Sequence, residues 1–113
     1  MTYDSELADR FRKMLKERDG ITEKRMMGGV CFFHNGNMIG GADRTKDGDG
    51  RFKFRVGKDN EAEALSRPGT TIVEQGGRRM GGLVFVDDNA CDDQALSEWG
   101  SLALAYVTEL PPK

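Results

Sequence analysis

The chain has 113 residues, of which 37% are hydrophobic and 32% are charged, and its formal net charge is −2 at pH 7. This length and composition suit one globular domain that buries roughly two-thirds of its unfolded surface without disulfide staples. The charged N-terminal stretch argues against a signal peptide, and no apolar run reaches the roughly 18 residues of a membrane span. We therefore expect a single cytoplasmic domain over residues 1–113.

Charge is unevenly divided along the chain. Residues 1–56 hold 12 basic and 9 acidic side chains, whereas residues 57–113 hold 5 basic and 10 acidic. This balance lacks the strongly basic footprint of proteins that bind nucleic-acid phosphates, so direct nucleic-acid binding is disfavoured. The only two cysteines, Cys31 and Cys91, indicate a reducing compartment and two buried free thiols, with a disulfide between them as the less favoured alternative.

The N-terminal third predicts one helix followed by a hairpin. Apolar residues recur with the helical period over Asp4–Arg18. Glu23–His34 is rich in β-forming residues and precedes Asn35-Gly36, the dipeptide that best supplies the two positive φ angles of a type I′ turn. We expect the chain to fold back through Asn37–Ala42.

Basic and apolar residues then alternate with a period of two over residues 51–56. This pattern predicts a strand with Arg51, Lys53 and Arg55 on the outer face and with the intervening phenylalanines and valine on the inner face. Beyond it, the pattern predicts a short helix, two strands joined by a glycine turn, and a final amphipathic helix. These are expected at Asp59–Ser66, Thr71–Gln75, Arg79–Asp87 and from Asp92-Asp93 onward.

The predicted order is α-β-β-β-α-β-β-α, with connections short enough for antiparallel pairing. It indicates an α+β fold, a two-layer sandwich in which the helices cover one face of an antiparallel sheet. The other face would be free for solvent or a partner. An exposed edge strand would also allow a homodimer.

No complete catalytic or metal-binding set is recognisable, and we expect no cofactor and no enzymatic activity. Cys31 and His34 form C-x-x-H, but residues three apart on a strand point to opposite faces and no further Cys or His completes a zinc site. We interpret the four aspartates of residues 87–93 as a turn and a helix cap. The paired glycines lack the strand-to-helix setting of a phosphate-binding loop.

Positive charge on the predicted strands is the best candidate surface. If these strands are adjacent, their basic side chains would line the open face of the sheet and attract an acidic protein, a phosphate or a nucleic acid. The alternative is an ordinary solvated face. The residues are Lys24, Arg25, Arg51, Lys53, Arg55, Arg78 and Arg79.

Several stretches together resemble the TfoX N-terminal domain family. The first are KRMMGGVCF, from Lys24 to Phe32, and NGNM, from Asn35 to Met38. Further stretches follow in the family's order, so the resemblance covers nearly the whole chain. They are Arg55–Gly57, Ala64–Gly69, Gly77–Met80, Val84–Asp87 and Leu110–Lys113.

The resemblance implies a bacterial protein with a two-layer fold. Full-length members of the family are linked to natural competence and act on transcription as coactivators, and the chain ends where their second, helical domain would begin. The first hypothesis is therefore a non-enzymatic regulatory module that binds a protein partner. The alternative is a small-ligand or anion-binding domain, which the paired glycines and nearby arginines suggest. The family supplies no catalytic residues, and Lys24, Arg25, Gly28, Gly29 and Asn35–Asn37 serve only as its markers.

Overall fold

The computed structural model of the chain describes residues 5–26 and 29–113, so Asp4 of the predicted first helix and the marker Gly28 lie outside it. The α-helices of this part are α1 (Ser5–Met14), α2 (Glu61–Leu65) and α3 (Asp93–Val107). The strands are β1 (Ile21–Met26), β2 (Gly29–His34), β3 (Asn37–Arg44), β4 (Gly50–Arg55), β5 (Thr70–Gln75) and β6 (Arg78–Asp87). Two short 3-10 helices are η1 (Lys58–Asn60) and η2 (Asp88–Ala90). None of the described helices has the length and apolar character that crossing a bilayer requires.

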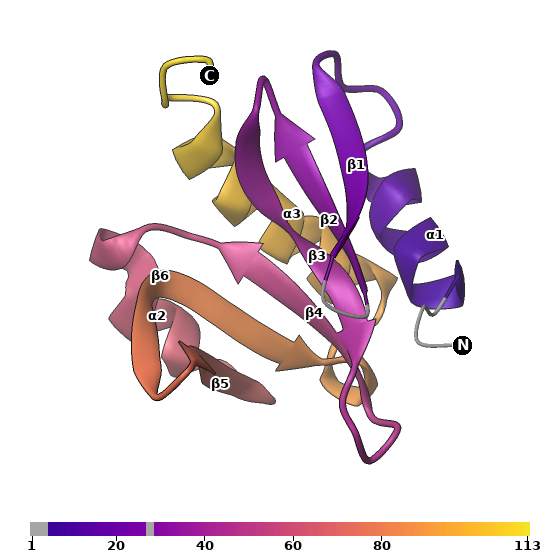
Figure 1. Cartoon of the computed structure of the whole chain (residues 1–113), viewed down its shortest axis with the longest axis vertical. Helices are drawn as coiled ribbons and strands as arrows, with labels where there is room; N and C mark the ends of the chain where they lie inside the picture. Colours follow the sequence, from indigo (N-terminus) through magenta and orange to yellow (C-terminus); the bar gives the residue numbers. More distant parts are fainter. Residues whose placement is uncertain (1–4, 27–28) are drawn as a thin grey trace.

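The strands form one antiparallel sheet in the order β1-β2-β3-β4-β6-β5, with the helices packed on one side of it (Figure 1). The predicted α+β two-layer fold is confirmed. The segment Glu23–His34 contains two strands instead of one, because β1 and β2 pair with Met26 opposite Gly29. High β-propensity shows that a segment is extended but does not show where it reverses. The homodimer through an edge strand stays a prediction.

The core lies between the sheet and the helices, and aromatic rings form its centre. Phe11 of α1 stacks on Phe32 at 4.7 Å between ring centroids and on Phe54 at 5.5 Å. Phe54 in turn stacks on Trp99 of α3, also at 5.5 Å. The predicted alternation in β4 is confirmed, since Phe52 and Phe54 are fully buried on the helix side. Arg51 and Lys53 therefore project from the opposite, open face. Arg55, which was predicted on the same face, instead lies over the ring of Tyr106 of α3.

Two local predictions about chain reversal and helix capping are also confirmed. Asn35 and Gly36 have φ angles of 49° and 87°, the two positive values of a type I′ turn between β2 and β3. Asp92 precedes α3, and its carboxylate accepts a hydrogen bond of 2.8 Å from the Ala95 N–H. The turn fixes where β3 begins, and the cap fixes where α3 begins.

The C-terminal tail is held against the β2–β3 turn. Asn37 is only 3% exposed, and its Nδ2 donates a 2.9 Å hydrogen bond to the Pro111 carbonyl. The Lys113 N–H donates another bond of 2.9 Å to the Asn35 carbonyl. Two of the family-like stretches, NGNM and LPPK, thus contact each other through the Asn37 side chain and through a backbone hydrogen bond.

Replacing Asn37 by alanine should release this tail. We expect Asn37→Ala to lower the free energy of unfolding by about 1–3 kcal/mol, because a buried hydrogen bond is lost and the Pro111 carbonyl loses its donor. Urea unfolding followed by circular dichroism measures the loss. The exposed Asn89→Ala is the control, with an expected change within about 0.5 kcal/mol. Equal losses in the two variants would contradict the proposed tail contact.

Candidate functional site

The open face of the sheet carries a cleft of about 180 Å³ to which all six strands contribute. Met26 of β1 and Val73 of β5 both line it, although these two strands are the opposite edges of the sheet. In a flat sheet of this order the edges would lie roughly 24 Å apart, at about 4.8 Å per strand. The sheet is therefore strongly curved, and the cleft occupies its concave side.

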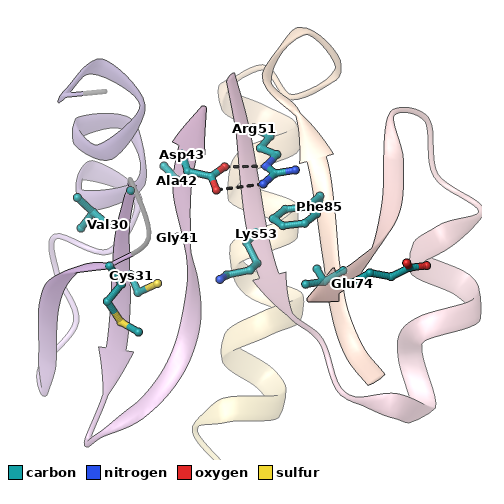
Figure 2. A pocket seen from close by; sticks show the side chains of 12 residues that line it. Val30, Cys31, Gly41, Ala42, Asp43, Arg51, Lys53, Glu74 and Phe85 are labelled. Atoms are coloured by element: carbon teal, nitrogen blue, oxygen red, sulfur yellow. Dashed lines mark hydrogen bonds and ion pairs between the residues drawn. The ribbon is translucent and has the colours of Figure 1, made fainter. Parts of the chain in front are cut away.

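Glycines form part of the cleft floor, where a neighbouring strand approaches too closely for a side chain. Gly29 and Gly41 lie there on neighbouring strands. Gly41 pairs with Cys31 on one side and with Lys53 on the other. Figure 2 shows the Lys53 side chain extending from β4 toward β3, on the side from which the Cys31 thiol faces it. A Cβ at Gly41 would lie 2.3 Å from the Val30 carbonyl oxygen, so the close approach of β2 requires glycine at this position.

Arg51 forms one wall of the cleft and its charge is already neutralised. Its Nε and Nη2 donate to the two carboxylate oxygens of Asp43 at 2.7 and 3.2 Å. The guanidinium also lies 3.6 Å from the ring centroid of Phe85, as Figure 2 shows. A bidentate pair stacked on a ring is geometrically fixed. Arg51 therefore contributes to the shape of the cleft, and its charge is not available to a ligand.

Lys53 is the unneutralised cation of the cleft. It is half-buried and forms no ion pair with any residue in 5–26 or 29–113. Cys31, which it faces, is 5% exposed, and burial raises the pKa of this thiol although the nearby Lys53 charge acts in the opposite direction. Cys31 is therefore protonated at neutral pH and is a weak nucleophile. Lys53 is the group most available to a ligand.

The seven basic residues predicted as a surface do not form one patch. Arg51 and Lys53 line the cleft, and Lys24 lies in the same cross-strand row because it pairs with Cys31. The others lie elsewhere on the domain. Arg25 pairs with Val30 on the helix side of β1, Arg55 lies over Tyr106 of α3, and Arg78 and Arg79 begin β6 beside the turn. Whether any of them binds a partner stays a prediction.

Three residues of the cleft were not predicted as site residues from the sequence. The predicted strand ended at Ala42, one residue before Asp43, Cys31 was expected only as a buried free thiol, and Phe85 received no role. Phe85 lies within the continuous apolar run LVFV, whose members do not reveal by their type which face each occupies. The pairing of Phe85 with Lys53 across β4 and β6 supplies that information.

The sequence arguments on Cys31 and His34 agree with the geometry. The two side chains lie on opposite sides of β2, because Cys31 pairs with Gly41 on the open face and the helix-facing Phe32 is two residues from His34. Across the residues that the structure describes, no three His, Cys, Asp or Glu side chains are placed to hold a metal ion. Both cysteines there are free thiols. Burial raises the pKa of Cys91 to about 11.

Glu61 of α2 forms a second polar cluster at the end of the sheet. Its Oε2 accepts a 2.6 Å hydrogen bond from the Gly82 N–H, and its Oε1 pairs with Arg79. The hydrogen bond from the Gly82 N–H is the main reason why the pKa of this carboxyl lies below its ordinary value of 4.5. Glu61 is therefore ionised at neutral pH and links α2 to β6.

Acid should weaken this link. Because the folded pKa of Glu61 is depressed, its contribution to stability is complete above pH 4.5 and is lost as the pH falls through the folded value. We expect Glu61→Gln to cost about 1–2 kcal/mol at neutral pH and less at acid pH, measured by urea unfolding across the acid range. Glu63→Gln, which removes only an exposed pair with Arg67, is the control. A pH-independent loss for Glu61→Gln would contradict the assignment.

The fold and the cleft define a small α+β domain with an open, concave antiparallel sheet. The chain belongs to the TfoX N-terminal domain family, whose model matches residues 13–106. Neither a curated protein nor a solved structure matches the chain.

Proposed function

We propose that the domain is a non-enzymatic interaction module that binds an acidic segment of a protein partner in the cleft. The observation that supports this best is Lys53, a half-buried cation without an ion-pair partner among the described residues, on the face that the helices leave open. A carboxylate in this position would gain a charge-assisted hydrogen bond in a partly desolvated site. The role in transcription and competence that the family resemblance implies fits such a module.

The size of the cleft favours a single side chain over a free small molecule. Its volume of about 180 Å³ is below the roughly 300–1,000 Å³ of pockets that enclose drug-sized ligands. Met26, Val73 and Phe85 offer apolar walls around Lys53. An aspartate or glutamate of an extended partner segment would place its methylene groups against these walls and its carboxylate on the ammonium group.

The same residues argue against two other functions. A site for single-stranded nucleic acid uses open aromatic rings for base stacking, but the Arg51 guanidinium covers Phe85. A Cys-His nucleophile requires a base beside the thiol, and His34 lies on the other side of β2 from Cys31. The TfoX N-terminal domain family is also not a known enzyme family. These points support binding as the function.

Charge reversal at Lys53 tests the proposal. We expect Lys53→Glu to weaken partner binding by at least about 30-fold, because truncating or reversing a buried charge pair costs about 2–5 kcal/mol. Tagged wild-type and variant domains are used to capture proteins from a bacterial lysate, and the partner found is then titrated against each. Lys16→Glu, which makes the same charge change at an exposed position just after α1, is the control.

Cys31 provides an independent measurement on the wild-type chain. A partner segment in the cleft should protect Cys31 from a thiol reagent, while the reactivity of the fully buried Cys91 stays the same. If the same proteins bind the wild type and Lys53→Glu with equal affinity, or if Cys31 remains equally reactive in the complex, the cleft is not the binding site.

A further inference from the structure

A second hollow lies at the end of β4, away from the cleft, and is built around Gly57. The chain turns there with φ 88° and ψ 152°, and Gly57 packs between Gly82 of β6 and the ring of Tyr106 of α3. We call this space, of about 370 Å³, the end hollow. Its main lining residues are Arg55, Gly57, Lys58, Asn60, Gly82 and Tyr106.

Two cations flank the end hollow. The Arg55 guanidinium lies 5.6 Å from the ring centroid of Tyr106. On the other side of Gly57, the methylene stem of Lys58 lies along Gly81. Neither cation forms an ion pair with a residue of 5–26 or 29–113. The end hollow therefore has two positive groups whose charge is available to a ligand.

The half-buried carboxylate of Glu61 does not neutralise them. Glu61 uses one oxygen for the Gly82 N–H and the other for Arg79. The Lys58 charge contributes least among the causes that lower the pKa of Glu61. The remaining acid, Asp59, is exposed at the rim and makes no ion pair with the described residues. A ligand anion would thus meet Arg55 and Lys58 without displacing an existing pair.

Size and charge together indicate the class of ligand. The volume of the end hollow is twice that of the cleft and lies within the range of small-molecule pockets. A phosphate ester carries a charge of about −1.5 to −2 and three acceptor oxygens, so it can engage a guanidinium and an ammonium at once. Tyr106 lines the same hollow and would contact the rest of the molecule. We propose that the end hollow binds the phosphate group of a small phosphorylated metabolite.

Nuclear magnetic resonance of the ¹⁵N-labelled chain tests the site directly. Inorganic phosphate and AMP are titrated separately, with adenosine and succinate as probes without a phosphate and with chloride at matched ionic strength. We expect the amide signals of Gly57, Lys58 and Gly82 to shift with phosphate and AMP at millimolar concentrations or below. Arg55→Gln and Lys58→Gln should each weaken this binding on the order of ten-fold, whereas Lys16→Gln should leave it unchanged.

Each other outcome overturns the proposal. Absence of these shifts, shifts that centre on Arg78 and Arg79, equal binding of succinate, or full affinity in Arg55→Gln and Lys58→Gln would show that the end hollow is not a phosphate site. The signals of the variants also report whether they are folded. Lys53→Glu should bind phosphate like the wild type, so the result does not depend on the function proposed for the cleft.

Discussion

Phe11→Ala is expected to lower the free energy of unfolding by about 3–5 kcal/mol. The Phe11 ring is fully buried and is the only contribution of α1 to the aromatic stack that continues through Phe32 and Phe54. Its removal leaves a cavity between the helix layer and the sheet, and also removes ring contacts worth about 0.5–1.5 kcal/mol each. A loss of this size is a large part of the 5–15 kcal/mol that typically stabilises a domain.

Urea unfolding of the wild type and the variant measures this loss, provided that the two transitions have the same slope. Phe33→Ala is the matched control, because Phe33 lies on the other side of β2 and is only half-buried. We expect a clearly smaller loss for Phe33→Ala. Similar losses in the two variants would show that Phe11 is not the centre of the core.

The fold could be predicted because its signals are local. The turn at Asn35-Gly36 follows from the backbone angles that those two residues adopt readily, and the faces of β4 follow from strict alternation. The division of Glu23–His34 into β1 and β2 could not be predicted in this way. Both strands consist of β-forming residues, and the register that places Met26 opposite Gly29 depends on the burial of one face of the assembled sheet.

The candidate site could be predicted only in part, because it depends on strand order and curvature. Alternation correctly placed Arg51 and Lys53 on the open face. It carried no information on the partners of these residues, which come from other strands. Asp43 of β3 neutralises Arg51, whereas no described carboxylate neutralises Lys53. Arg51 therefore has a structural role, and the charge of Lys53 is available to a ligand. Arg55, two residues further on, points instead to a different hollow beside Tyr106.

Gly57→Ala is expected to have the second-largest effect, a loss of about 2–5 kcal/mol in the free energy of unfolding. The φ and ψ angles of Gly57, 88° and 152°, lie in a region that is essentially limited to glycine and costs other residues about 1–3 kcal/mol. A Cβ at this position would also lie 2.6 Å from Cδ1 of the Tyr106 ring. Overpacking of this kind costs a further 1–3 kcal/mol or so, since the ring is backed by α3.

Two comparisons separate the strain in the backbone from the contact with the ring. Gly76→Ala adds a methyl group at a residue with φ 61° and nothing within 4 Å, so we expect only the backbone cost of about 1–2 kcal/mol. Combining Gly57→Ala with Tyr106→Ala removes the clash, so the double variant should lose at least 0.5 kcal/mol or so less than the sum of the two single losses. If the losses are additive, or if Gly57→Ala costs no more than Gly76→Ala, Tyr106 does not close the end hollow over Gly57. If the losses are less than additive, Gly57 and Tyr106 both stabilise this part of the fold and set the shape of the proposed phosphate site.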